Sequence, residues 1–471
     1  MTDHRPVPSR SASEEGVDHP TVRALRAAIA APTIARDAGT DADASADLLA
    51  AETAAFDRLH AALAEHFPLL HGTLDLVRPA GHALLFRWRG RTDADPVVLM
   101  AHQDVVPIGD GSTWTYPPFA GVVADSPEGP AIWGRGALDD KGCLVAICAA
   151  VERLLGEGFV PQRDIWLSFG SDEEVMGITA EAAVDHLRDA DVRPWFVLDE
   201  GGAVAADALP GITAPMAVIG VSEKGLALLE LRAEGRGGHA STPARNGPVV
   251  RVATAIAALD RASMPVRLPE PSRELLRRMI PVLSGPMRRA VSMVDGPLAP
   301  VFTRALGMAG PEASAMARTS LATTMISGSP APNAIAASAS AIVNARIVVG
   351  DTIAGVVRHV RRVVGSGVEV RVIGGSEPSP VSPYRDDPAF DLLEKLTNSV
   401  FPEATPSPYL MLGATDSRHF TRICNRVYRF APFPMSRAQR ESVHSFDERL
   451  TVDGLLRGVE WYIALLRGIP E

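Results

Sequence analysis

Short apolar runs that end in acidic or imidazole side chains constrain the fold of this chain more than any other feature. Three such runs are residues 96–101, 164–170 and 195–198. The side chains that follow them are His102 and Asp104, Glu173 and Glu174, and Asp199. Runs of this length predict strands buried on both faces, and ligands of an open α/β sheet collect beyond the carboxyl ends of its strands. The pattern therefore predicts one cleft that holds a histidine and several carboxylates.

A cleft of this kind favours metal ions. Asp139 and Asp140 follow the turn Gly134-Arg135-Gly136 and add two acids between the first two runs. Carboxylates packed closely repel one another and resist burial unless cations neutralise them. A helix cap would explain one of these acids but not the whole set. We interpret the set as a two-metal hydrolase site.

The bulk properties narrow the class of protein. A chain of 471 residues predicts two or more domains, and a net charge of −10 argues against nucleic acid as a partner. Three cysteines give no disulfide framework, so a reducing compartment, the cytoplasm, is expected. We find no apolar span long enough to cross a bilayer and expect no membrane partner. The polar residues 1–20 are expected to be disordered.

The order of predicted elements indicates two domains. Alternating strands and helices predict an α/β catalytic domain, residues 21–219 plus 375–471, whose mostly parallel twisted sheet carries helices on both faces. Near Gly220 an alternating strand begins a self-contained block with further strands and helices. We expect this block, residues 220–374, to be a smaller inserted α+β domain that acts as a lid or in dimerisation. It carries a helical insertion near 265–318.

Six motifs point to one family. They occupy residues 102–107, 114–119, 133–142, 172–174, 237–241 and 415–420. One His-x-Asp pair is weak evidence, whereas the ordered set is specific. The chain resembles the M20 family of metallopeptidases, and within it the branch that contains carboxypeptidase S and the N-acyl-amino-acid hydrolases.

The resemblance implies a ligand set for two divalent ions. The implied ligands are His102 and Asp199 for one ion, Glu174 and His444 for the other, and Asp139 for both, with a cis peptide to Asp140. Glu200 is the rival of Asp199, which we prefer because the family pattern places the ligand at the first acid. His419 is the rival of His444, which we prefer because residues 441–448 resemble the family's C-terminal metal segment. Zinc is expected, although mixed nitrogen and oxygen ligands also tolerate cobalt and manganese.

Further roles follow from the same resemblance. Asp104 would orient His102, and Glu173 would remain unligated and transfer a proton from water to the leaving nitrogen. His239 would stabilise an oxyanion, from a neighbouring subunit or by domain closure. Arg346 would hold a substrate carboxylate, and Asn333 would help to bind the substrate. A turn histidine and a solvated strand arginine are the alternative interpretations of His239 and Arg346.

The predicted function is hydrolysis of an amide beside a free carboxylate, in an N-acyl amino acid or at the C-terminal residue of a short peptide, by metal-activated water. A dipeptidase is the nearest alternative, and a homodimer remains open. A non-catalytic binding protein on the same scaffold is a further alternative, against which the intact Glu173 argues. A phosphate site at Gly134-Arg135-Gly136 is disfavoured, because the lysine-serine/threonine signature is missing and two acids follow.

Overall fold

The structure is a computed structural model that describes residues 18–36, 46–175, 177–207, 211–243 and 245–471. The expected disordered segment 1–20 lies almost entirely outside these ranges. The chain divides into two compact units. Unit 1 comprises Met1–Gly220, Ser382–Ser407 and Thr415–Glu471, and unit 2 comprises Val221–Val381 and Pro408–Ala414.

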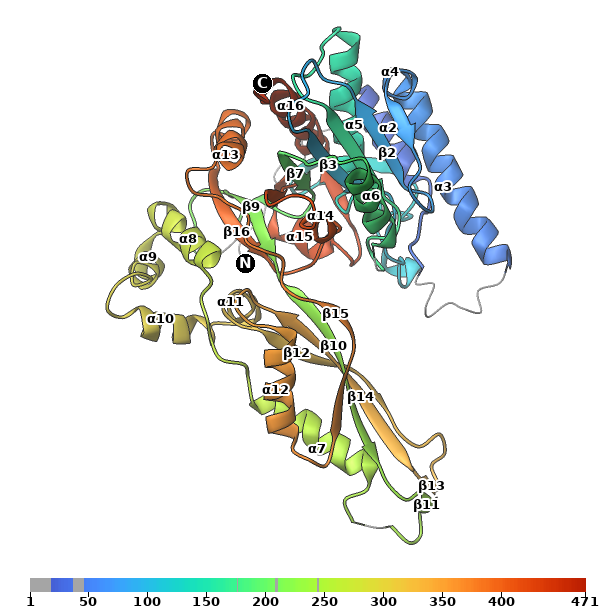
Figure 1. The fold of residues 1–471 in the computed structure, drawn as a ribbon, viewed down its shortest axis with the longest axis vertical. Coiled ribbons are helices and arrows are strands. Elements are labelled where there is room, and N and C mark those ends of the chain that lie inside the picture. Colours follow the sequence, from blue (N-terminus) through green and yellow to red (C-terminus); the bar gives the residue numbers. More distant parts are fainter. Residues whose placement is uncertain (1–17, 37–45, 176, 208–210, 244) are drawn as a thin grey trace, which may run out of the picture. The chain divides into compact units, whose positions relative to one another are not determined.

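The larger sheet has ten strands in the order β1-β2-β6-β3-β7-β17-β9-β8-β18, with β16 paired to β9 (Figure 1). The strands are β1 (Asp75–Val77), β2 (Leu84–Trp88), β3 (Val97–His102), β6 (Ile165–Gly170), β7 (Phe196–Asp199), β8 (Ala203–Ala205), β9 (Met216–Glu223), β16 (Thr405–Met411), β17 (Val427–Arg429) and β18 (Pro434–Met435). Its centre is parallel, since β3 pairs in parallel with β6 and β7, and β7 with β17. Antiparallel strands β1 and β2 form one edge.

The three central strands explain why the acids meet. Every residue of β3, β6 and β7 is buried, as the uninterrupted apolar runs predict. In the parallel register Val97 lies opposite Ile165 and His102 opposite Gly170. The carboxyl ends of these strands therefore lie at one edge of the sheet. The side chains that follow them in sequence begin from neighbouring positions.

Helices cover the sheet of unit 1 (Figure 1). They are α2 (Pro20–Ile29), α3 (Ala46–His66), α4 (Pro68–Thr73), α5 (Lys141–Gly156), α6 (Ile178–Asp189), α13 (Pro388–Val400), α14 (Ser417–Phe420), α15 (Arg437–Ser442) and α16 (Val452–Gly468), with the 3-10 turn η1 (Gly111–Thr113). Val98 and Met100 of β3 pack against α6, and α5 also contacts β3 while it packs against α2 and α16. Alternate side chains of a strand point to opposite faces, which accounts for helices on both. The predicted α/β class is confirmed.

A second, three-stranded sheet in unit 1 has the order β19-β5-β4. Its strands are β4 (Val122–Ser126), β5 (Gly129–Trp133) and β19 (Arg449–Thr451). Strand β5 leads through a tight turn into α5, and β19 follows His444 by only a few residues. Because β19 pairs with β5, Arg449 opposite Trp133, the C-terminal segment is held next to the turn that carries Asp139.

Unit 2 contains a four-stranded antiparallel sheet in the order β12-β14-β10-β15. Its elements are β10 (Gly225–Glu234), β11 (Gly238–His239), α7 (Pro248–Arg261), β12 (Ser320–Ser327), β13 (Ala334–Ile335), β14 (Ser338–Ile347), α12 (Ile353–Val364) and β15 (Glu369–Ser376). Alternate residues of β10 and β14 are buried, and Leu229, Val343 and Val360 belong to one apolar core with α7 and α12. The alternation predicted near 223–233 thus marks a sheet with one covered face.

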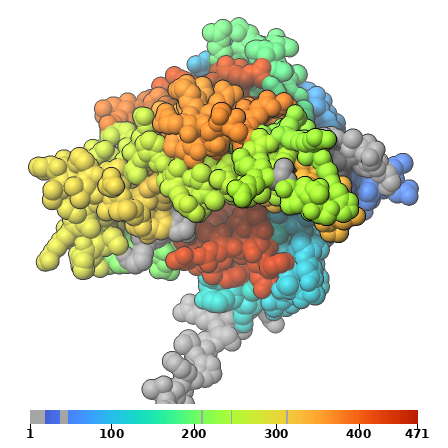
Figure 2. All heavy atoms as spheres, turned by 90° about the horizontal axis from the view of Figure 1, so that it is seen from below, coloured from blue at the N-terminus to red at the C-terminus, as the bar shows by residue number. Residues whose placement is uncertain are grey.

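A helical segment separates α7 from β12, where the sequence predicts an insertion. It consists of α8 (Glu270–Met279), the 3-10 turn η2 (Ile280–Val282), α9 (Gly285–Val291), α10 (Ala299–Leu306) and α11 (Pro311–Ala317). Figure 2 shows much of this segment in yellow at the surface. Among the described residues, no helix combines the length and the apolar character needed to cross a bilayer.

Candidate metal centre and active site

The Asp139 carboxylate lies between two imidazole rings. Its Oδ1 is 3.0 Å from Nε2 of His102, and its Oδ2 is 3.0 Å from Nε2 of His444. Nε2 of His444 is also 3.1 Å from the carboxylate of Glu174. Each Asp139 oxygen therefore faces a different histidine, as a carboxylate shared between two cations would.

One group of side chains has the spacing of a metal site. Among the described residues, ligand atoms of His102, Asp139 and Glu174 all lie within 4.8 Å of one another. Imidazole nitrogen and carboxylate oxygen are the donors that zinc and related ions take in proteins. The donor chemistry therefore fits a divalent cation.

The pKa values of the two histidines show the same preference of the site for positive charge. Burial lowers the pKa of His102, but hydrogen bonds with Asp104 and Asp139 outweigh it and hold the pKa well above its usual value. Hydrogen bonds with Asp139 and Glu174 raise the pKa of His444 to about 10 against the effect of burial. Both imidazoles therefore lie where the surrounding carboxylates favour positive charge. A divalent ion would meet the same carboxylates.

Asp104 fixes the positions of several of these groups. Nδ1 of His102 donates to the Asp104 carbonyl at 3.0 Å and lies 3.4 Å from the Asp104 carboxylate, so that Nε2 faces Asp139. The same carboxylate accepts the backbone N–H groups of Glu173 at 3.2 Å and Glu174 at 3.1 Å. Asp104 is fully buried. It connects the end of β3 to the loop after β6. Its role in orienting His102 stays a prediction.

The turn before α5 holds Asp139 through a buried ion pair that the sequence reasoning missed. Glu448 accepts the N–H groups of Leu138 at 2.8 Å and Asp139 at 3.1 Å, and it pairs with Arg135 at 2.7 Å. Arg135 also donates to the Ser445 carbonyl at 2.7 Å. Breaking a buried pair of this kind typically costs about 3–5 kcal/mol. The available signal was the arginine of the Gly134-Arg135-Gly136 turn, which needs a buried acid as its partner.

Asp140 does not act as a simple helix cap. The Asp139–Asp140 peptide bond is cis, and Asp140 is the N-cap of α5 without a capping hydrogen bond from its side chain. Its carboxylate instead accepts the backbone N–H of His102 at 3.2 Å. The turn and the end of β3 are therefore joined directly.

Glu173 is partly buried and lies among other acids. Burial raises the pKa of Glu173 well above its usual value, and Asp416, Glu174 and Asp139 raise it further against the opposing effect of His102. Glu173 does not belong to the close group formed by His102, Asp139 and Glu174. A carboxyl group with a raised pKa beside a metal position can accept and return a proton.

The two candidate histidines, His444 and His419, have different contacts, and so do the two candidate acids, Asp199 and Glu200. His444 contacts Asp139 and Glu174, whereas Nε2 of His419 is buried and has no hydrogen-bond partner among the described residues. Asp199 ends β7, and its carboxylate accepts the N–H groups of Glu200 at 3.0 Å and Ser417 at 2.9 Å.

Glu200 also lies among the acids. Burial raises its pKa well above the usual value, with further contributions from Asp199, Asp139, Asp140 and Glu173. Neither Asp199 nor Glu200 belongs to the close group of ligand atoms that the described residues form. The choice of Asp199 stays a prediction.

The predicted substrate residues all belong to unit 2. His239 is exposed on β11, and its Nδ1 lies 2.8 Å from Oγ of Ser241. The N–H of Ala240 donates to the Asn333 carbonyl at 3.1 Å, so the His239 and Asn333 segments lie together. Arg346 is half-buried near the far end of β14 from these two.

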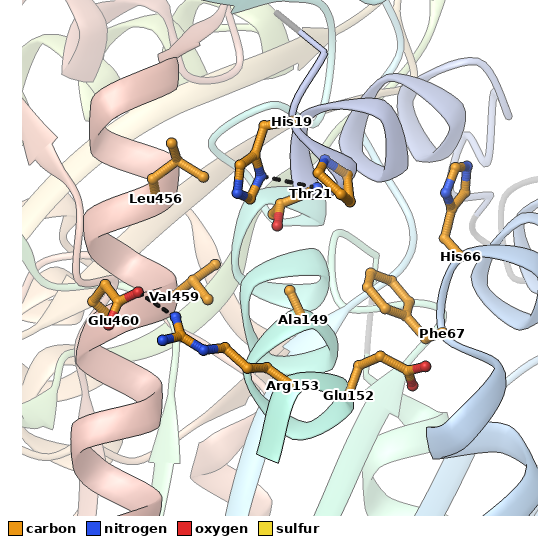
Figure 3. A pocket seen from close by; sticks show the side chains of 11 residues that line it. His19, Thr21, His66, Phe67, Ala149, Glu152, Arg153, Leu456, Val459 and Glu460 are labelled. Atoms are coloured by element: carbon orange, nitrogen blue, oxygen red, sulfur yellow. Dashed lines mark hydrogen bonds and ion pairs between the residues drawn. The ribbon is translucent and has the colours of Figure 1, made fainter. Parts of the chain in front are cut away.

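A separate pocket of about 350 Å³ lies between α2, α5 and α16 (Figure 3). Its wall includes Phe67 and Val459, and Arg153 pairs there with Glu460 at 2.6 Å. None of the predicted metal or catalytic residues lines this pocket. It is distinct from the histidine and carboxylate centre.

Comparison with known proteins agrees with this geometry. The chain matches the family model described as peptidase family M20/M25/M40 over residues 98–468. It is 33% identical to probable carboxypeptidase S-like 2 of Dictyostelium discoideum over 422 residues, which cover 88% of this chain and 80% of that protein. It is 32% identical to the human N-fatty-acyl-amino acid synthase/hydrolase PM20D1 over 385 residues, 79% of this chain and 74% of that protein. The chain belongs to the M20 peptidase family.

Solved structures share the fold at low sequence identity. The dipeptidase Dug1p of Saccharomyces cerevisiae aligns with a TM-score of 0.67 at 17% identity, over 97% of this chain and 98% of that chain. Human carnosine dipeptidase 1 aligns with a TM-score of 0.65 at 16% identity, over 95% of both chains. These likenesses establish the fold alone.

The contacts of Asp104 generate a prediction about metal affinity. Replacing Asp104 by Asn removes the charge predicted to orient His102 and weakens the anchor of the Glu173–Glu174 loop. We expect zinc affinity to fall by about 10- to 100-fold, the usual effect of losing a partner of a metal ligand. Competition with a fluorescent chelator measures it.

The matched control for this variant is Asp164→Asn. Asp164 is also hydrogen-bonded, to Arg87 and to the N–H of Gly90, but it precedes β6 at the opposite end of the strand. Zinc affinity of the control should equal that of the wild type. Equal affinity in Asp104→Asn would show that Asp104 does not position the ligands.

Proposed function

We propose that the protein hydrolyses an amide bond next to a free carboxylate, in N-acyl amino acids or at the C-terminal residue of short peptides. The observation that carries the proposal is the Asp139 carboxylate between His102 and His444, with the partly buried Glu173 close enough to be affected by its charge. Relatives named as carboxypeptidase S-like and as N-fatty-acyl-amino acid hydrolases support the substrate class. Dipeptidases share the fold only at low identity, so a dipeptidase activity ranks second.

We propose two divalent ions, most simply zinc. His102 and Asp199 would hold one ion, Glu174 and His444 the other, and Asp139 both. The separate contacts of the two Asp139 oxygens support this division. When bound, the ions supply Lewis-acid polarisation of the scissile carbonyl and lower the pKa of water. Cobalt and manganese suit the same donors.

The protein's own groups would move the proton. Glu173 would take a proton from the attacking water as a carboxylate and then give it to the leaving nitrogen. Asp104 keeps the backbone of Glu173 in place through its N–H. A pure binding protein would not need an unligated acid at this position.

Unit 2 would supply substrate recognition as a lid or dimerisation domain, with unit 1 as the catalytic domain. Arg346 would pair with the substrate carboxylate, while His239 and Asn333 would serve the carbonyl end. Burial and the nearby Arg346 lower the pKa of Lys224 to about 8, while Asp351 opposes this shift, so Arg346 and Lys224 lie close enough to act on each other.

We also propose a homodimer that forms through the edge of the unit 2 sheet. Among the described strands, edge strand β12 pairs only with β14, and it exposes Met325 at 67% and Ile326 at 62%. Val249 and Val250 of α7, which packs against β12, are also exposed. Exposed apolar edges of this kind commonly pair with a second copy. A light-scattering mass of a single chain would exclude the dimer.

A reducing compartment, the cytoplasm, is also proposed. Cys143, Cys148 and Cys424 are all buried as free thiols rather than paired in disulfides. Burial raises the pKa of the Cys424 thiol to about 11, which keeps it in the unreactive thiol form.

Glu173→Gln tests the activity itself. The amide keeps the shape of the side chain but cannot take a proton, so kcat should fall by about 10²- to 10⁴-fold. Metal content by elemental analysis should stay equal to that of the wild type. Turnover is measured on a panel of N-acyl amino acids and dipeptides, which also ranks the two substrate classes.

Glu181→Gln is the control, because Glu181 lies on α6 and pairs with Arg422 at the surface. It should retain wild-type turnover. Full activity of Glu173→Gln would show that Glu173 does not carry the proton. Absence of turnover by the wild type on the whole panel would favour a binding protein.

Arg346→Met tests recognition of the free carboxylate. Losing a charge-assisted hydrogen bond should raise KM about 10- to 100-fold for N-acyl amino acids. KM for the uncharged C-terminal amides of the same compounds should be the same in the variant and in the wild type. Arg232→Met, on neighbouring strand β10, is the matched control and should leave KM unchanged. An unchanged KM in Arg346→Met would show that Arg346 does not bind the substrate carboxylate.

A further inference from the structure

Helix α10 presents an apolar stripe to solvent. Leu298, Val301 and Met308 are 54%, 65% and 71% exposed, and Ala305 between them is also exposed. Val301 and Ala305 lie four residues apart on one side of α10. Leu298 is the N-cap of this helix and Met308 follows its last residue by two positions, so the exposed apolar groups continue past both of its ends. The buried Phe302 supplies the inward contact instead. Three of the large apolar side chains named here therefore face solvent, and one packs inward.

Arginines of α9 and α10 add positive charge to this surface. Arg304 of α10 and Arg288 and Arg289 of α9 are exposed. Across the ranges that the structure describes, the guanidinium groups of these three arginines form no ion pair and no hydrogen bond, and the Ser292 hydroxyl donates only to the backbone carbonyl of Arg288. The arginines of α8 differ, because Arg277 pairs with Glu270, Glu274 and Asp295.

The one aspartate between α9 and α10 does not neutralise them. Asp295 pairs with Arg277 at 2.6 Å and also lies near Arg273 of α8. Met287 of α9 adds a further exposed apolar side chain, at 37%. Residues 285–308, which we call the α9–α10 surface, thus combine exposed aliphatic and thioether groups with three uncompensated cations. This segment belongs to the yellow surface in Figure 2.

We propose that the α9–α10 surface docks on an anionic lipid bilayer. An apolar stripe flanked by arginines is the composition by which short helices lie at a membrane interface, with apolar groups among the acyl chains and cations at the headgroups. Anionic headgroups complement the three free arginines, whereas a purely apolar partner would leave them unpaired. The whole chain carries a net charge of −10, so its overall charge does not attract it to an anionic membrane. The proposed docking therefore depends on the local positive charge of the α9–α10 surface.

Docking of this kind is a surface contact. It needs no bilayer-crossing helix and does not rest on the proposed hydrolase activity. The sequence analysis expects no membrane partner because no apolar span is long enough to cross a bilayer, and the proposed interfacial contact departs from that expectation.

Vesicle flotation of the full-length protein tests the proposal. One arm uses phosphatidylcholine vesicles with about one third phosphatidylglycerol, a composition that gives the surface a negative potential, and the other uses phosphatidylcholine alone. The wild type should float with the anionic vesicles and remain at the bottom with the neutral ones. Raising the salt to about 0.5 M should release it, because the arginine–headgroup attraction is screened.

Two sets of variants separate the contributions. Val301→Glu with Met308→Glu should abolish flotation, and Arg304→Gln should weaken partitioning about fivefold. Leu49→Glu is the matched control, since Leu49 is 53% exposed on α3 of unit 1, and it should float like the wild type. All these positions are exposed, so circular dichroism and thermal unfolding should match the wild type and show that each variant folds.

Three results would overturn the proposal. They are no flotation of the wild type on anionic vesicles, equal flotation on both vesicle types, and unchanged flotation of the double glutamate variant. A drop in molecular mass by light scattering in that variant, without vesicle binding by the wild type, would assign the stripe to a contact between two copies instead.

Discussion

The shared position of the Asp139 carboxylate is the constraint on which the centre depends. One of its oxygens faces His102 and the other faces His444, each at 3.0 Å. An acid surrounded by other acids in a buried place is costly unless positive charge is close. The carboxylates around the two imidazoles raise their pKa values, which shows that the position favours positive charge. The same requirement explains why the centre suits divalent cations.

The rest of unit 1 keeps that carboxylate and its neighbours in register. Parallel pairing of β3 with β6 and β7 places His102, the Glu173–Glu174 loop and Asp199 at one edge of the sheet. Asp104 joins the first two of these, and the buried Arg135–Glu448 pair holds the turn of Asp139. The pairing of β19 with β5 keeps the C-terminal segment beside that turn. A displacement of any one of these contacts would therefore shift the side chains around Asp139.

How much the sequence predicts depends on whether a residue follows a regular element. His102 and Asp199 are the last residues of β3 and β7, and Glu174 lies in the loop after β6, so strand geometry places all three beyond the carboxyl ends of neighbouring strands. His444 follows no strand and has a positive φ of 58° in an irregular segment, so only its family-like surroundings favoured it over His419. Glu448 was missed because a buried acid that pairs with an arginine has no periodic signal in sequence. Asp199 and Glu200 are adjacent and both near the acids, which no pattern separates.

The most direct test of the central claim is a zinc-edge anomalous difference map from crystals of the active protein. The account predicts two anomalous peaks, one beside each oxygen of the Asp139 carboxylate, adjacent to His102 and to His444. Active crystals with no peak at Asp139, or with a single peak remote from it, would contradict the account.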